Sequence, residues 1–324
     1  MKHALRITII LLVMFLVTQF IGLFVVNHYI NNENPLPYGF EPSREDTSIC
    51  SDSSGILACF GVLIFQTIFF ALAITLFLFL IRIKAKWFLK TWFFLVVVIS
   101  LAVSLAAFAN IINIKNATLI ALILAIIIGY IKVFRRNMLV HNFTELFIYP
   151  GVAAVITSLL FFLFGKLTLF FTILILIAIS IYDIWAVWHS GIMQKMAKFQ
   201  MNELGVLGGF LIPYADKKVK DKIRLLKLKF KNKDIPQSII KKNKIKVNIA
   251  ILGGGDIVFP IIAAGVFFKT FHSFAGALCV ILLATLALLY LFAFAKKKKF
   301  YPAMPYISTG IFIGMIVGYL ISLI

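Results

Sequence analysis

Nine apolar segments of a length suited to crossing a lipid bilayer dominate this sequence of 324 residues. A helical crossing needs about 20 mainly apolar residues. The segments cover residues 5–27, 55–81, 91–111, 117–131, 146–164, 167–188, 249–268, 273–295 and 303–324, the fourth being the shortest. Hydrophobic residues make up 62% of the chain and charged residues only 14%, which excludes a soluble globular protein. The sequence therefore predicts an all-α, polytopic membrane protein with nine transmembrane helices.

The basic residues fall on one side of this predicted bundle. Of the 32 Lys and Arg residues, 28 lie in the N-terminus and in the loops after the second, fourth, sixth and eighth segments. Lys132 is one of these loop residues, and Glu145 lies beside the same loop. Because Lys- and Arg-rich loops stay in the cytoplasm, we expect a cytoplasmic N-terminus and an external C-terminus. The net charge of +20 then reflects topology and does not predict a nucleic-acid partner.

The chain is expected to divide into three parts. Residues 1–188 form a six-span N-terminal part, residues 189–248 a basic cytoplasmic loop, and residues 249–324 a three-span C-terminal part. Within the loop, residues 204–215 are apolar but too few to span a bilayer. We expect this stretch to lie at the membrane interface or against the bundle.

Two carboxylates stand inside apolar segments, where an ionised side chain is costly. Asp183 precedes the cytoplasmic end of the sixth segment by five residues, and Asp256 lies about seven residues into the seventh. At a rise of 1.5 Å per residue, the two lie roughly 8 Å and 10 Å from the same membrane face. Two neighbouring carboxyls in a low dielectric share one proton, so one can activate a water while the other acts as an acid. We interpret them as a catalytic pair that needs no metal or other cofactor.

Glycine and proline residues adjoin this pair. Gly253, Gly254 and Gly255 directly precede Asp256, and a glycine triplet permits local unwinding and close backbone approach. Pro302 and Pro305 interrupt the start of the last segment and leave backbone groups free to bind a partner. Glycines also occur in packing seams between helices, and proline is common at helix starts. Alone, these glycines and prolines therefore do not indicate a catalytic site. They support that interpretation because they lie next to the two aspartates.

Three short motifs carry a family resemblance. In chain order they are Tyr182-Asp183, Gly253-x-Gly255-Asp256 and Pro302-Ala303-Met304. With these motifs the chain resembles the presenilin and signal-peptide-peptidase family of intramembrane aspartyl proteases, also called the GxGD type, and is most similar to a prokaryotic, archaeal-type homologue of presenilin. The resemblance covers nearly the whole chain. It departs at Met304, where the family usually has Leu, a change that preserves an apolar side chain of similar volume.

The resemblance implies an endopeptidase that cuts within the transmembrane segments of membrane proteins. It implies that Asp183 and Asp256 are catalytic, and that residues 302–304 help to hold an unwound substrate. Tyr182 and the three glycines would support the same site. The expected partners are transmembrane-helix protein substrates and the lipid bilayer, and in a prokaryote the expected location is the plasma membrane. The chain itself indicates no accessory subunit.

Two other functions are open to a chain with this pattern. A cation channel or proton-coupled transporter would use the two buried Asp residues to bind or relay cations, but the segment before Asp183 is almost wholly apolar. A scaffold would use the pair only to clamp two spans, although buried ionisable groups stabilise weakly. Metal catalysis is not expected, since the five histidines are scattered and form no HExxH motif.

Overall fold

The computed structural model describes residues 5–30, 36–38, 55–83, 85–135, 137–190, 208–214, 248–295 and 301–323. This part of the chain is mostly helical. Its long helices are α1 (Leu5–Ile30), α2 (Gly55–Arg82), α3 (Lys86–Ile111), α4 (Ala117–Phe134), α5 (Met138–Phe164), α6 (Thr168–Trp185), α10 (Gly254–Phe271), α11 (Phe274–Phe294) and α12 (Met304–Ser322). A 3-10 turn, η2 (Gly165–Leu167), joins α5 to α6, and a π-helical turn, η3 (Ala186–Ser190), follows α6.

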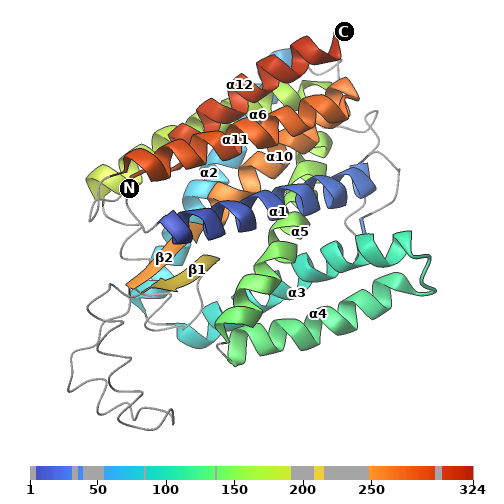
Figure 1. Ribbon diagram of the computed structural model, residues 1–324, viewed down its shortest axis with the longest axis vertical. Coiled ribbons are helices and arrows are strands. Elements are labelled where there is room, and N and C mark those ends of the chain that lie inside the picture. Colours follow the sequence, from blue (N-terminus) through green and yellow to red (C-terminus); the bar gives the residue numbers. More distant parts are fainter. Residues whose placement is uncertain are drawn as a thin grey trace.

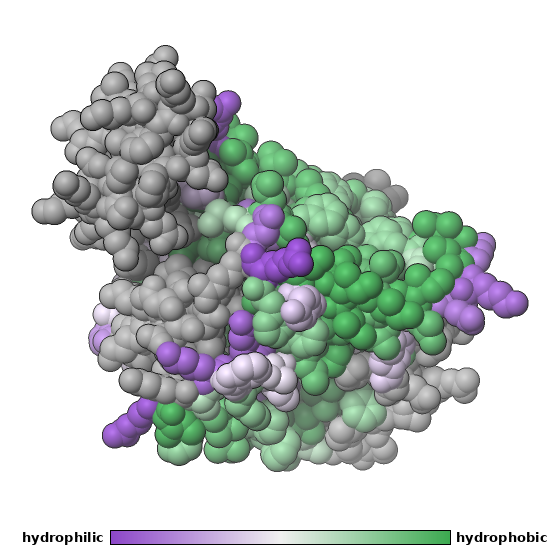
Figure 2. Space-filling view, turned by 90° about the horizontal axis from the view of Figure 1, so that it is seen from below, coloured by the Kyte–Doolittle hydropathy of each residue, from purple (hydrophilic) through white to green (hydrophobic). Residues whose placement is uncertain are grey.

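Eight stretches of the described chain are long and apolar enough to cross a membrane. One of them, Met138–His189, has 52 residues and contains both α5 and α6. The short fourth segment of the sequence forms an 18-residue helix, α4. The outer surface agrees with a lipid environment, because side chains such as Leu57, Trp87 and Leu139 are more than 80% exposed. Figure 2 shows broad apolar areas on one face of the molecule, and the chain is an integral, multi-pass membrane protein.

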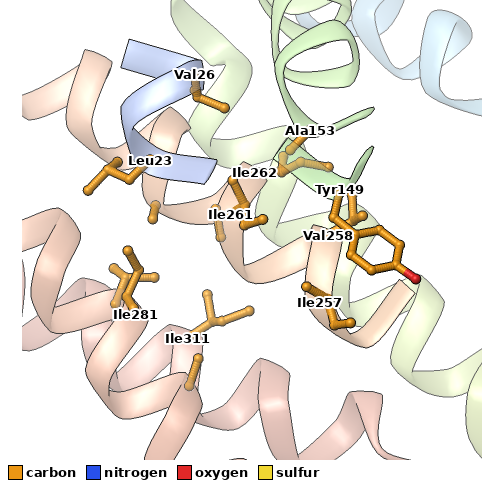
Figure 3. Packing of buried hydrophobic residues seen from close by; sticks show 14 of the residues in the cluster. Leu23, Val26, Tyr149, Ala153, Ile257, Val258, Ile261, Ile262, Ile281 and Ile311 are labelled. Atoms are coloured by element: carbon orange, nitrogen blue, oxygen red, sulfur yellow. The ribbon is translucent and has the colours of Figure 1, made fainter. Parts of the chain in front are cut away.

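The helices form two groups that meet at the centre of the molecule. In Figure 1, α11 and α12 lie side by side with α6 against α12, whereas α3 and α4 pair at the other side. The helices α1, α5 and α10 pack together between these groups. Figure 3 shows this core, where Ile261 of α10 lies on the side of α1 and Ile257 lies nearer to Tyr149 of α5. Ile257 and Ile261 are fully buried, so α10 is held on several sides.

The prediction of an all-α protein is wrong in one respect. A two-stranded antiparallel sheet pairs β1 (Gly209–Tyr214) with β2 (Asn248–Gly253), with Gly209 opposite Gly253. Residues 249–253, predicted as the start of the seventh span, therefore belong to β2, and Asp256 is only the third residue of α10. An apolar run alone does not distinguish a buried strand from a helix. The partner strand decides it here. This strand, β1, belongs to the apolar stretch 204–215, and β1 itself lies against α5 and α1.

Candidate active site

Asp183 lies in the last turn of α6 and contacts the start of α12. Its Oδ2 accepts a hydrogen bond of 3.1 Å from the backbone N–H of Met304. Met304 is the first residue of α12, and Ala303 is the N-cap. The first amides of a helix have no partner within it, so the carboxylate of Asp183 satisfies one of them. The helix N-terminus also favours a negative charge at this position.

Asp256 lies in the first turn of α10, and its carboxyl lies close to the residue that precedes the helix. Gly253 is the N-cap, in an extended conformation with φ −65° and ψ 146°, and a Cβ added to it would lie 3.1 Å from Oδ2 of Asp256. A side chain at the third helical position can reach back to the N-cap residue, as in a capping box. The local geometry of the β2–α10 junction therefore fixes the Asp256 side chain.

The tertiary structure places these two carboxyls on helices that are in contact. The helices α6, α10 and α12 contact one another, with Asp183 in the last turn of α6 and Asp256 in the first turn of α10. The hydroxyls of Ser180 on α6 and Ser308 on α12 are hydrogen-bonded at 2.9 Å, about one turn from Asp183. The sequence prediction that the two aspartates lie near each other is consistent with this arrangement. Two such carboxyls can share a proton and exchange acid and base roles.

The other site residues predicted from the sequence differ in their burial and in their contacts. Pro302 and Met304 are buried at the start of α12, beside Asp183. Tyr182, in contrast, is 36% exposed, and its ring centre lies 6.2 Å from that of Trp185. Among the described residues, no group of three or more His, Cys, Asp and Glu side chains is arranged to hold a metal ion. The best-defined contacts of the site are thus those of the two carboxyls and residues 302–304.

The three glycines before Asp256 have different surroundings. A Cβ added to Gly253 would lie 3.1 Å from Oδ2 of Asp256, and one added to Gly254 would lie 2.8 Å from Cε1 of Tyr149. A Cβ at Gly255 would meet only Phe259, at 3.7 Å. A Cβ at Gly254 would therefore overlap the Tyr149 ring, one at Gly253 would require the Asp256 carboxyl to shift slightly, and the third position has room for a side chain.

The sequence prediction missed a buried polar cluster in which Lys132 of α4 meets residues of α5 beside β1. Nζ of Lys132 is 2.5 Å from Oε1 of Glu145, and their side chains are 0% and 2% exposed. Lys132, counted from the sequence in the loop after the fourth segment, thus lies within α4, and Glu145, expected beside that loop, lies within α5. His141 Nε2 lies 3.5 Å from the same Glu145 oxygen and 2.9 Å from the carbonyl oxygen of Gly209. Because both neighbours are acceptors, Nε2 carries the hydrogen. The i, i+4 spacing of His141 and Glu145 was the available signal.

A second contact ties α5 to the outer edge of β1. Nδ2 of Asn142 donates to the carbonyl oxygen of Leu211 at 2.8 Å, and the Leu211 amide donates to Oδ1 of Asn142 at 3.0 Å. The amide side chain thus replaces a neighbouring strand at this residue. Together with His141 at Gly209, it occupies the edge of β1 that faces away from β2.

The chain is similar to a known protein family and to solved structures. Residues 58–324 match the family model described as signal-peptide peptidase, presenilin aspartyl protease, and no curated protein matches the sequence. A solved presenilin-family intramembrane aspartate protease, in its C222 crystal form, is 16% identical with a TM-score of 0.54, and the match covers 97% of this chain and 99% of that one. The P2 form gives 17% identity, a TM-score of 0.55 and 96% coverage of each chain.

These similarities agree in fold and in family. They do not favour the alternative of a cation channel or proton-coupled transporter. The matched region contains both aspartates and residues 302–304. The chain belongs to the signal-peptide-peptidase and presenilin family of intramembrane aspartyl proteases.

Proposed function

We propose that this protein is an intramembrane aspartyl endopeptidase that hydrolyses peptide bonds within the transmembrane segments of membrane proteins, with Asp183 and Asp256 as the catalytic pair. One observation carries the proposal. The two carboxyls lie in the last turn of α6 and the first turn of α10, helices that contact each other, and Asp183 accepts a hydrogen bond from the Met304 amide. The family to which the chain belongs supports the same chemistry.

In the proposed reaction the two carboxyls act as base and acid. The ionised carboxylate takes a proton from a water molecule, whose oxygen bonds to the carbonyl carbon of the substrate while the C=O π electrons move onto the carbonyl oxygen. The protonated carboxyl then gives its proton to the peptide nitrogen as the C–N bond breaks and the C=O double bond re-forms. Two interacting carboxyls in a low dielectric hold one proton between them, which is the state that the first step requires. The scheme uses no metal or other cofactor.

The substrate has to be extended at the scissile bond, because a helix encloses its carbonyls in backbone hydrogen bonds. An extended segment can add to the edge of a sheet. The edge of β1 is occupied by His141 and Asn142, so we propose that the substrate pairs with β2, beside Asp256. Residues 302–304 and Tyr182 would hold the same segment. Unchanged cleavage by a Pro302→Leu variant would contradict the part assigned to the proline motif.

We further propose nine transmembrane spans, with a cytoplasmic N-terminus and an external C-terminus. The 52-residue stretch that contains α5 and α6 supports nine, because it is about twice the length of one crossing. The distribution of Lys and Arg supports the orientation. The three-part organisation at residues 1–188, 189–248 and 249–324 follows from it, with the plasma membrane as the location in a prokaryote.

Cleavage of a defined substrate tests the proposed function. The purified protein is reconstituted in lipid with a single-span model substrate, beside the Asp183→Asn and Asp256→Asn variants, and the products are identified by mass. Both substitutions preserve side-chain shape, and thermal unfolding checks that the variants are folded. We expect the parent to cut within the substrate helix and neither variant to cut.

Two outcomes would contradict this expectation. Equal cleavage by all three proteins would assign the activity to a contaminant. A folded parent that cuts no single-span substrate would count against the proposed activity for the chain alone, and ion flux through liposomes would then test the channel alternative.

A further inference from the structure

Gln19 lies in the apolar helix α1, and its side-chain amide binds α10 beside the second candidate aspartate. Nε2 of Gln19 donates a hydrogen bond of 2.9 Å to the backbone carbonyl oxygen of Ile257. Ile257 directly follows Asp256 in the chain, and both Gln19 and Ile257 are fully buried. Because a carbonyl oxygen only accepts, the amide nitrogen is the atom that faces it. The proposed mechanism does not use this contact.

The backbone of α10 lacks a hydrogen bond at the same turn. Pro260 lies inside α10 and has no N–H, so it cannot donate the usual helical bond to the carbonyl four residues earlier, which is that of Asp256. The first turn of α10 therefore has fewer bonds to the following turn than a regular helix has. The Gln19 amide supplies a bond from outside the helix to the adjacent carbonyl.

Two further contacts fix α1 against α10. A Cβ added to Gly22 of α1 would lie 2.6 Å from the Ile261 side chain, and one added to Gly265 of α10 would lie 2.4 Å from Cγ1 of Val26. With the amide contact, these pairs follow one another by about one turn along both helices. The two helices thus run in the same direction in close contact, and this packing places the amide opposite the first turn of α10.

Stability alone does not explain an amide at this position. Oε1 of Gln19 is buried and has no hydrogen-bond partner among the described residues. A buried polar atom without a partner is unfavourable, so an apolar side chain of the same size would suit the packing of α1 on α10 better. The bond from Nε2 to the Ile257 carbonyl is what the amide contributes in return.

We propose that Gln19 is a positioning residue for Asp256. By holding the Ile257 carbonyl, it fixes the first turn of α10 and with it the direction in which the Asp256 carboxyl points. The inference rests on the proposed function. Proton transfer requires the carboxyl to lie within hydrogen-bond reach of the group that gives or takes the proton, and a small displacement of a catalytic group slows the reaction strongly.

Three substitutions separate this role from a structural one. Gln19→Met removes the amide and keeps a side chain of similar length, whereas Gln19→Asn keeps an amide that is one methylene too short for the bond. The matched control is Tyr29→Phe, also on α1, because Tyr29 is 1% exposed and its hydroxyl donates to the carbonyl oxygen of Val103 in α3 at 2.7 Å. Each variant loses one buried bond from α1 to a backbone carbonyl of another helix.

Cleavage of the single-span substrate and thermal unfolding are measured for the parent and the three variants. In both Gln19 variants kcat should fall about 10- to 100-fold, with KM unchanged because the residue does not contact substrate. Gln19→Met should unfold near the temperature of the parent, since it also removes the unpaired Oε1. In Tyr29→Phe the unfolding temperature should fall and kcat should stay unchanged, because a buried bond is lost away from Asp256.

Four results would overturn the inference. An unchanged kcat in a folded Gln19 variant would show that the bond does not affect the reaction, and a rise in KM without a change in kcat would show that the amide binds substrate. An equal fall of kcat in Tyr29→Phe would indicate general loosening of α1. Failure of both Gln19 variants to fold would make the bond structural. Failure of the proposed function looks different, because the parent and Tyr29→Phe would then also be inactive.

Discussion

Gly209 lies opposite Gly253 in the β1–β2 sheet, and Gly253 is also the N-cap of α10. The chain thus passes from strand to helix at the residue against which the Asp256 carboxyl packs. On the other side of Gly209, His141 of α5 binds its carbonyl oxygen. The position of Asp256 is therefore set by the sheet as well as by its own helix. Substitutions in β1 should thus affect the candidate active site, although β1 contributes no catalytic residue to it.

A Gly209→Ala substitution should destabilise the sheet. Gly209 has a φ of +137°, and a Cβ there would lie 2.4 Å from the carbonyl oxygen of Leu252. A side chain in this backbone conformation costs about 1–3 kcal/mol, and the contact adds to that cost. We expect a lower unfolding temperature together with reduced cleavage. The neighbouring Gly208→Ala is the control, since nothing lies within 4 Å of its added Cβ. Equal effects of the two variants would contradict the explanation.

Adjacent glycines before Asp256 should respond differently to alanine. In Gly254→Ala the added Cβ would lie 2.8 Å from Cε1 of Tyr149, and such overpacking costs about 1–3 kcal/mol. In Gly255→Ala the nearest atom is at 3.7 Å, in Phe259, so stability should change by less than about 0.5 kcal/mol. Thermal unfolding of the two purified variants measures the difference. If Gly255→Ala proved the more destabilised variant, the assigned packing would be wrong.

Removing one member of the buried Lys132–Glu145 pair should destabilise the protein strongly, whereas replacing both by apolar residues should destabilise it little. Lys132→Met alone leaves an uncompensated carboxylate and Glu145→Leu alone an uncompensated ammonium, and loss of one partner of a buried pair costs about 3–5 kcal/mol. The double substitution removes both charges and should recover most of that loss. The free energies of unfolding of the two single variants and of the double variant give the coupling energy between the two residues. Additive effects would show that the two charges do not stabilise each other in the folded protein.

The hydrogen bond between Ser180 and Ser308 should be detected as a coupling between α6 and α12. The two hydroxyls are 2.9 Å apart, and Ser308 is 2% exposed. Ser180→Ala leaves the Ser308 hydroxyl without this partner, at a cost of about 1–3 kcal/mol, and replacing both serines removes that penalty. Ser308→Ala should cost less, because the Ser180 hydroxyl still bonds the carbonyl oxygen of Leu176 at 2.8 Å. A double-mutant cycle on the unfolding free energy measures the coupling. A coupling near zero would mean that the bond does not hold the two helices together.

The apolar segments and the two buried aspartates could be predicted from the sequence because each is a local property. Lipid requires long apolar helices, and a carboxylate inside such a helix is conspicuous by its cost. The order of the motifs around Asp183 and Asp256 was sufficient for the family resemblance. The start of the seventh helix could not be predicted in this way, since residues 249–253 are equally apolar whether they form a strand or a helix.

The sequence by itself determined that the chain spans a membrane many times and which carboxyls stand inside it, because hydropathy and charge are read residue by residue. Only the tertiary structure decided that residues 248–253 pair with β1, that Lys132 and Glu145 neutralise each other inside the protein, and that Tyr149 reaches Gly254. Each of these depends on contacts between residues far apart in the chain. Such contacts follow from how helices and strands pack, which no local pattern of residue types specifies.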